Sequence, residues 1–306
     1  MPLRHVLESQ QFDPFLLSKL FELAEKMKVK MNYYTPPPLA GRILYTLFYE
    51  PSTRTRMSFE TAAARLGMNI IGTENAREFS SAVKGETLED TIRVLCQYRP
   101  DAIVIRHHET GAAERAATVS SVPIINAGDG RGQHPTQALL DLFTITETFG
   151  SIKGLTVAMV GDLLNGRTVR SLSYLLARFA KVKLIFVSPP ELRMADDLKV
   201  WLSGKDVTFY ETENLVDALA EADVIYCTRI QKERGANIPE EILSKFRIGT
   251  PQMNIMRSHA ILMHPLPRVN EILPEIDSDP RAKYFEQAGN GMYVRMALLL
   301  WILHKI

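Results

Sequence analysis

Short apolar runs of β-prone composition alternate with helix-like stretches along most of this chain, and this alternation constrains its fold more than any other feature. In the N-terminal part the strand-like runs are 43–49, 69–72, 102–106 and 123–126. A second series follows a helix-like stretch over 136–149, with strand-like runs at 156–161, 183–188, 207–211, 224–227 and 260–263. Runs this apolar indicate strands covered on both faces, as in parallel sheets whose strands are joined by helices.

We therefore predict an α/β protein with two doubly wound parallel-sheet domains. At 306 residues the chain is too long for one usual hydrophobic core. The first predicted domain comprises 1–133 plus 289–306, because we expect the C-terminal helix to return to it, and the second comprises 134–288. Ligands of such sheets bind beyond the carboxyl ends of the strands, so we expect an interdomain active site formed from those ends.

The charge and the cysteine content argue against several classes of function. A formal net charge of +1 argues against nucleic acid or an anionic membrane as the main partner. Cys96 and Cys227 are too few for a disulfide framework, and without paired Cys/His clusters we expect no structural zinc. The segment 1–10 has no continuous apolar run, so we expect no secretory signal. The most apolar stretch, 296–303, is far shorter than the roughly 18 residues that span a bilayer.

The polar segment 50–56, Glu-Pro-Ser-Thr-Arg-Thr-Arg, lies between the first strand-like run and a helix-like stretch. Pro51 ends the strand, and Ser52 or Thr53 is a suitable helix cap. The start of a helix offers unpaired backbone N–H groups and the positive end of a dipole, and two arginines add bidentate donors. This combination predicts a site for a phosphate dianion. The alternative is an ordinary helix cap with solvated arginines; the unbroken run of hydroxyls and guanidiniums favours the phosphate site.

A glycine-rich loop within 126–137 ends in His134 and Gln137, which lie three residues apart at the start of a helix and so share one face. An imidazole and a carboxamide together can hold a carbonyl oxygen and an amide NH₂ group. The alternative is a loop whose His and Gln satisfy their own backbone. The neighbouring glycines and the expected interdomain position favour the binding interpretation.

Four cations lie at ends of strand-like runs or just before helices, in both predicted domains: Lys84, Arg106, Arg167 and Arg229. Any one of them is compatible with a surface ion pair, but the four together predict an anionic substrate. The segment 264–268, His-Pro-Leu-Pro-Arg, follows an apolar strand. Its two prolines fix a rigid loop that could present backbone carbonyls to an NH₂ group.

The segments Ser-Thr-Arg-Thr-Arg, His-Pro-Thr-Gln and His-Pro-Leu-Pro-Arg, in this order and spacing, resemble the carbamoyltransferase family over nearly the whole chain. The segments 84–86, 161–168 and 228–234 are similar to signatures of its aspartate-specific branch. The ornithine-specific branch typically has Cys in the loop where this chain has Leu266. The resemblance implies transfer of the carbamoyl group of carbamoyl phosphate to L-aspartate, giving N-carbamoyl-L-aspartate and phosphate, a step of pyrimidine biosynthesis.

The resemblance also implies a role for each matching residue, and it implies no metal or organic cofactor. The residues that would bind carbamoyl phosphate are Ser52, Thr53, Arg54, Thr55, Ser80, Arg106, His134, Gln137 and Leu266. Those that would bind aspartate are Lys84, Arg167, Arg229, Gln231 and Pro267. Those expected to act on the reacting groups are Arg54, Thr55, Lys84, Arg106 and His134. The aspartate amine attacks, so no protein nucleophile is needed.

Assembly and regulation are further implications of the resemblance. In the family, residues matching Ser80 and Lys84 reach into the neighbouring subunit's site, which implies a homotrimer with shared active sites. The segments 73–81 and 164–168 are similar to plant-type members, which act as free trimers inhibited by UMP. We expect a cytoplasmic location, with a plastid origin left open.

Two alternatives remain. One is a carbamoyltransferase for ornithine or another amine. The other is a non-catalytic ligand-sensing scaffold with the same fold. A decayed enzyme should first lose its costly polar site residues, yet the set named above is intact, and sites rather than folds decide function.

Overall fold

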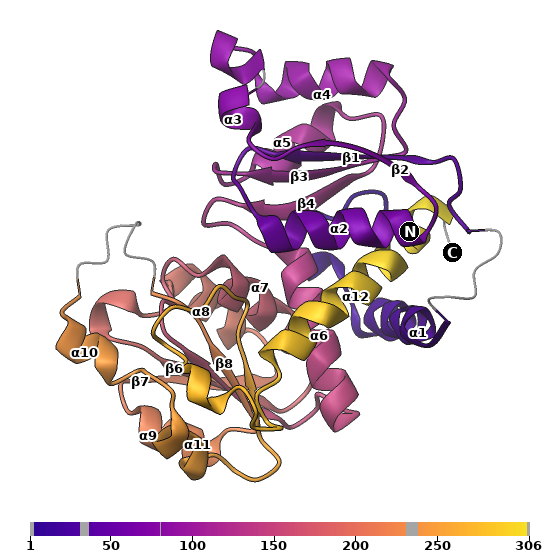
Figure 1. Cartoon of the computed structure of the whole chain (residues 1–306). Helices are drawn as coiled ribbons and strands as arrows, with labels where there is room; N and C mark the ends of the chain where they lie inside the picture. The colour runs from indigo at the N-terminus through magenta and orange to yellow at the C-terminus, as the bar shows by residue number, and fades with distance from the viewer. Residues whose placement is uncertain (1–2, 31–36, 80, 231–237, 305–306) are drawn as a thin grey trace. The chain divides into compact units, whose positions relative to one another are not determined.

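The computed structural model describes residues 3–30, 37–79, 81–230 and 238–304, and the chain divides into two compact units. Unit 1 is Met1–Leu140 with Gly289–Ile306, and unit 2 is Asp141–Ala288. Each unit contains a parallel β-sheet whose strands are joined by helices, which confirms the predicted α/β fold class (Figure 1). Two helices, α6 (Pro135–Phe149) and α12 (Tyr284–His304), contain the points where the chain passes between units.

The sheet of unit 1 has four parallel strands in the order β2-β1-β3-β4. The strands are β1 (Ile43–Phe48), β2 (Asn69–Thr73), β3 (Ala102–His107) and β4 (Ile124–Asp129). The strands β1, β3 and β4 are almost wholly buried, as their apolar runs predict, whereas β2 is a largely exposed edge strand. The strand β1 pairs with β2 on one side and with β3 on the other, so the strand order reverses at β1. The loops after β1 and β3 therefore flank the switch point at which ligands bind in such sheets.

Helices cover both faces of this sheet. In Figure 1, α2 (Thr53–Arg65) lies on one face, and α4 (Leu88–Gln97) and α5 (Ala112–Val119) lie on the other. The core between α4, α5 and the sheet includes the side chains of Tyr45, Leu47, Ile92, Ile103, Ile105 and Ala113. Unit 1 also contains α1 (Pro14–Lys30), the short helix α3 (Ala76–Phe79) and the 3-10 turn η2 (Ser81–Lys84).

Unit 2 has five parallel strands in the order β7-β6-β5-β8-β9. They are β5 (Thr156–Val160), β6 (Val182–Val187), β7 (Val207–Thr212), β8 (Val224–Cys227) and β9 (Ile261–Met263). The helices between them are α7 (Arg167–Leu176), α8 (Asp196–Ser203), α9 (Leu215–Glu221), α10 (Glu240–Ser244) and α11 (Thr250–Ile255). The order reverses between β5 and β8, so the loops after these two strands flank the switch point of unit 2.

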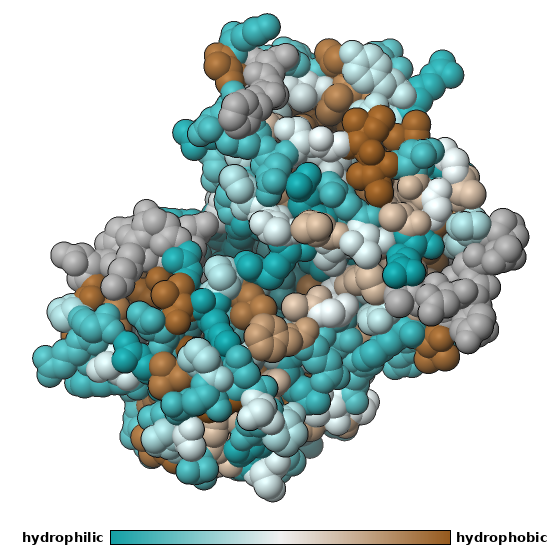
Figure 2. Space-filling model, viewed as in Figure 1, coloured by the Kyte–Doolittle hydropathy of each residue, from teal (hydrophilic) through white to brown (hydrophobic). Residues whose placement is uncertain are grey.

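The most apolar stretch of the chain forms the buried part of α12. Its residues Val294 and Met296 to Leu300 are at most 4% exposed, as expected for a helix docked in a core. Among the described residues, no helix is both long and apolar enough to cross a membrane. The face drawn in Figure 2 is mainly hydrophilic, with its apolar side chains in small separate groups.

Candidate active site

The segment after β1 is an open helix start. Ser52 is the N-cap residue of α2, with an extended backbone (φ −159°, ψ 92°), but its hydroxyl makes no capping hydrogen bond. The first turn of α2 contains no acidic residue. The helix therefore directs its first N–H groups and its positive dipole end outward, with the Ser52 and Thr53 hydroxyls beside them. An anion fits this arrangement, since the first turn of α2 has neither a side-chain cap nor an acidic residue of its own.

The two arginines of this segment differ in their surroundings. Arg56 Nη1 lies 3.4 Å from Glu60 Oε1 and its Nη2 lies 3.2 Å from Glu74 Oε2, so it is engaged in ion pairs. Arg54 is exposed and forms no ion pair with any described residue. Partial desolvation lowers the pKa of Arg54. An arginine nevertheless keeps its charge at any physiological pH. The structure thus singles out Arg54 as the guanidinium available to a ligand.

Arg106 brings a second cation to the same edge of the sheet. It lies opposite Phe48 in the β1–β3 register, close to the carboxyl end of β1. Its Nη2 donates to Glu50 Oε1 at 2.5 Å and its Nη1 donates to the Ala127 carbonyl at 3.3 Å. The side chain of Arg106 is 11% exposed. These contacts hold the guanidinium in place beside the start of α2.

The glycine-rich loop after β4 is built around the carboxylate of Asp129. Asp129 Oδ1 accepts from the Gln133 N–H at 2.8 Å, and Oδ2 accepts from the Gly111 N–H at 2.8 Å. Gly130 has a φ of +45°, and a Cβ there would meet the Thr110 nitrogen at 2.7 Å. Gly130 is therefore required by close packing. The strand β4 runs to Asp129 rather than ending near 126 as predicted.

His134 and Gln137 lie at the start of α6, as predicted. His134 directly precedes the helix and is 3% exposed, and Gln137 is 9% exposed. The Thr136 hydroxyl lies 3.4 Å from His134 Nδ1. The ends of β1, β3 and β4 thus place the 52–55 segment, Arg106 and His134 on one edge of the sheet, because carboxyl ends of parallel strands share an edge.

Lys84 stands apart from this group. The sequence predicted a polar loop, but Lys84 ends the 3-10 turn η2 and is exposed. It makes no hydrogen bond or ion pair with a described residue. Ser80, predicted beside it, lies outside the described residues.

Unit 2 carries its predicted arginines at its own switch point. Arg167 is the first residue of α7, after β5, and is 8% exposed. The turn before it is held by Asp162, whose Oδ1 accepts from the Asn165 N–H at 2.9 Å. Arg229 follows β8 by two residues and is partly exposed. Two cations at one switch point suit a ligand with more than one carboxylate.

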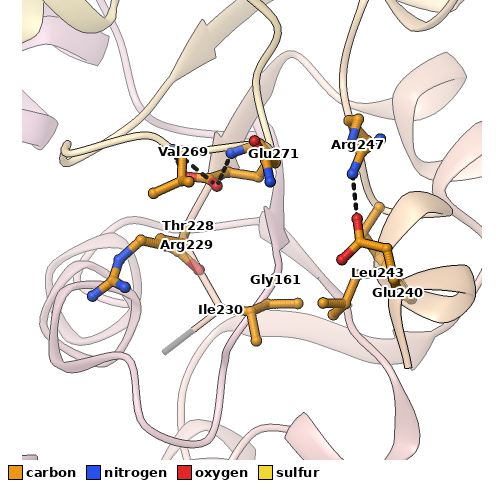
Figure 3. Close-up of a pocket in the computed structure, with 11 residues that line it drawn as sticks. Gly161, Thr228, Arg229, Ile230, Glu240, Leu243, Arg247, Val269 and Glu271 are labelled. Atoms are coloured by element: carbon orange, nitrogen blue, oxygen red, sulfur yellow. Dashed lines mark hydrogen bonds and ion pairs between the residues drawn. The ribbon is translucent and has the colours of Figure 1, made fainter. Parts of the chain in front are cut away.

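A pocket of about 180 Å³ lies beside Arg229 (Figure 3). Its lining residues include Thr228, Ile230, Leu243, Phe246 and Glu271, and an ion pair between Arg247 and Glu240. In Figure 3 the guanidinium of Arg229 points away from that ion pair. Gln231, predicted to act with Arg229, lies outside the described residues.

The backbone of the loop 264–268 has an unusual conformation at Leu266. Leu266 has a φ of +54°, and a cis peptide bond joins it to Pro267. The Leu266 N–H donates to His264 Nδ1 at 2.8 Å, so its position is fixed from within the loop. The prolines alone suggested a rigid loop; the roles of Asp129 and of the His264 ring were not predicted, although both residues lie within the segments singled out.

The pKa of His107, the last residue of β3, is shifted from its usual value. Burial, aided by the neighbouring His108, lowers the pKa of His107 from 6.5 to about 4, so this imidazole is neutral at pH 7. Its Nδ1 accepts from the Glu109 N–H at 3.0 Å. Within the described ranges, no group of three or more His, Cys, Asp or Glu side chains could hold a metal ion.

This chain is similar in sequence and fold to known proteins. Residues 4–147 match the model of the carbamoyl-P binding domain of aspartate/ornithine carbamoyltransferase, and residues 153–302 match that of its Asp/Orn binding domain. The chain is 54% identical over 302 residues to aspartate carbamoyltransferase 2, chloroplastic, of Pisum sativum, covering 97% of this chain and 78% of that protein.

Solved structures agree with the sequence matches. The catalytic subunit of M. jannaschii aspartate transcarbamoylase is 46% identical, with a TM-score of 0.90 and 99% of each chain covered. Aspartate transcarbamoylase of Trypanosoma cruzi in complex with N-(phosphonacetyl)-L-aspartic acid is 40% identical, with a TM-score of 0.91, covering 98% of this chain and 95% of that one.

Proposed function

Because the chain belongs to the aspartate/ornithine carbamoyltransferase family, we propose that it transfers the carbamoyl group of carbamoyl phosphate to the amine of L-aspartate, a step of pyrimidine biosynthesis. The observation that carries this proposal is the uncapped start of α2, where Arg54 lacks an ion-pair partner among the described residues. Such a site suits the phosphate of carbamoyl phosphate.

Activation of the carbamoyl group falls to the neighbours of this phosphate site. Thr55, Arg106 and His134 donate hydrogen bonds to the carbamoyl oxygen and stabilise the negative charge that develops on it. Gln137 and the Leu266 carbonyl orient the carbamoyl NH₂ group. The aspartate amine attacks the carbamoyl carbon, the carbon–oxygen bond to phosphate breaks, and the departing phosphate accepts the amine's proton. These roles are supported by the chemistry of the side chains and by their positions at the strand ends of their own units.

Aspartate, rather than ornithine, is the acceptor that unit 2 suits. Arg167 and Arg229 at its switch point supply two cations for two carboxylates, whereas the side chain of ornithine ends in an ammonium group that two cations would repel. Lys84, Gln231 and Pro267 complete the proposed aspartate site. The relatives and solved structures named above are themselves aspartate carbamoyltransferases.

We propose further that the enzyme is a homotrimer in which Ser80 and Lys84 act in the neighbouring subunit's site. The exposure of Lys84, without a described partner, supports this. UMP is proposed to compete with carbamoyl phosphate, since its phosphate suits the 52–55 segment. The predicted cytoplasmic location stays a prediction, and the Pisum sativum relative is named chloroplastic.

The direct test is formation of N-carbamoyl-L-aspartate by the purified protein from carbamoyl phosphate and L-aspartate. L-ornithine at the same concentration is the control acceptor. We expect product with aspartate alone. Citrulline formation at an equal rate would overturn the acceptor assignment, and no product with either amine would overturn the proposed reaction.

A further inference from the structure

The backbone at Leu266 needs support from its surroundings. Its φ of +54° lies in the left-handed region, which is unfavourable for a residue with a Cβ because the Cβ approaches the following carbonyl oxygen. A conformation of this kind persists only where neighbouring groups determine it, and it is most common at functional sites. The groups that determine it here form a connected set of buried hydrogen bonds within unit 2.

The imidazole of His264 is the first of these groups. The Leu266 N–H donates to its Nδ1 at 2.8 Å, so Nδ1 carries no proton. The neutral ring therefore carries its proton on Nε2, which lies 2.9 Å from Glu271 Oε1. His264 is 1% exposed. Its acceptor role at Nδ1 fixes the tautomer, and through this contact the ring holds the Leu266 N–H in a defined place.

The backbone of His264 is held in turn by Gln287 of α12. The His264 N–H donates to Gln287 Oε1 at 2.9 Å, and Gln287 Nε2 donates to Asp141 Oδ1 of α6 at 2.6 Å. A carboxylate only accepts hydrogen bonds, so Asp141 fixes which end of the Gln287 amide faces His264. The Tyr226 hydroxyl donates to the other carboxylate oxygen at 2.7 Å. All four residues are at most 1% exposed.

From this geometry we infer that His264 and Gln287 are positioning residues for carbamoyl transfer. They hold the loop in the conformation that the proposed contact of the Leu266 carbonyl with the carbamoyl NH₂ group requires, and Asp141 orients the Gln287 amide that anchors the His264 backbone. Neither side chain needs to touch the substrate. The inference rests on the proposed function, because it concerns the substrate contact of Leu266.

Two substitutions of His264 separate positioning from packing. In His264→Asn the carboxamide oxygen can accept the N–H two residues further along, as Asx turns do, so the Leu266 contact is kept. In His264→Ala that acceptor is lost. Because a misplacement of about 1 Å can cost roughly 10²-fold in rate, we expect His264→Ala to lose about 10²-fold in kcat and His264→Asn to remain within about tenfold of wild type.

Gln287→Met tests whether Gln287 positions the His264 backbone. It keeps the side-chain length and removes the hydrogen bonds to the His264 N–H and to Asp141. We expect it to lower kcat by about tenfold or more, and to weaken binding of carbamoyl phosphate more than that of aspartate. The control is Asp223→Asn. Asp223 directly precedes β8 and accepts from the Thr156 N–H, so this substitution disturbs the amino edge of the sheet, opposite to the carboxyl edge that holds the proposed site. It should lower the melting temperature and leave kcat unchanged.

The inference is overturned if His264→Ala keeps wild-type kcat, or if His264→Asn is as impaired as His264→Ala at equal melting temperature. Crystal structures of both variants give a readout independent of activity: the positive φ of Leu266 should persist in His264→Asn and be lost in His264→Ala. If the wild type makes no carbamoyl aspartate, the proposed function fails, while the φ of Leu266 still decides whether His264 determines the loop.

Discussion

Replacing Arg54 and Arg56 separately by Ala tests which guanidinium binds the phosphate. The two residues lie on the same helical turn of α2 and look equivalent in the sequence. They differ in that Arg56 has Glu60 and Glu74 as ion-pair partners, whereas Arg54 has none among the described residues. We therefore expect Arg54 to serve the ligand and Arg56 to serve the fold.

The expected magnitudes follow from these surroundings. Loss of one contact to a developing charge costs about 10²–10³ in kcat, or roughly 2.7–4 kcal/mol of transition-state stabilisation. Arg54→Ala removes an exposed side chain, so its free energy of unfolding should stay within about 0.5 kcal/mol of wild type. The ion pairs of Arg56 involve side chains that are 25–43% exposed, and such pairs contribute about 0.2–1 kcal/mol each. Arg56→Ala should thus lose about 1 kcal/mol of stability and keep most of its kcat.

Steady-state kinetics with both substrates and urea unfolding of the same preparations measure these two quantities. The expected pattern is a crossed one, in which one variant loses rate and the other loses stability. Near-normal kcat in Arg54→Ala would refute the assignment of the phosphate site. So would an equal loss of kcat in both variants, because it would show that ion pairing does not distinguish the two arginines.

Three further predictions concern the acceptor, the assembly and the pH dependence. Arg229→Ala should weaken aspartate binding far more than carbamoyl phosphate binding, as titration calorimetry with a bisubstrate analogue and with carbamoyl phosphate alone would show; equal losses would contradict it. Co-refolding inactive Arg54→Ala and Lys84→Ala chains should restore about a third of the wild-type rate in mixed trimers, since one interface then carries both intact residues; heterotrimers as inactive as their parents would exclude a shared site. The pKa of His107, lowered by burial to about 4, means that the unfolded chain binds this proton first as pH falls. The contribution of His107 to the free energy of unfolding should be complete above about pH 6.5 and fall by up to about 3 kcal/mol towards pH 4. In urea unfolding, His107→Gln should flatten this part of the pH dependence; an unchanged slope would rule out His107 as its cause.

The positions of the strands and the starts of α2 and α6 were predictable because their signals are local. The apolar runs located all nine strands of the two sheets. A buried parallel strand needs a continuous apolar segment, and the edge strands β2 and β7, which are only partly buried, were found as well. The end of the strand near 126 was placed too early, because Ala127 and Gly128 resemble loop residues although they continue β4 to Asp129. Lys84 was expected in a loop and ends a 3-10 turn instead, a short element without its own periodicity.

The supports of the site were not predictable, because they join residues that are distant in the sequence. Nothing local relates Gln287 to Asp141 or to His264, although the structure brings them within 2.6 and 2.9 Å of one another. The motif around Leu266 is recognisable because its residues are consecutive, His264 among them. The groups that fix the His264 backbone, Gln287 of α12 and Asp141 of α6, come from separate elements and appear in the sequence as ordinary helix residues. A substitution at Gln287 would therefore be scored as a core change from sequence alone. The hydrogen-bond chain gives it a different expected effect, on kcat for a reaction whose atoms it does not contact.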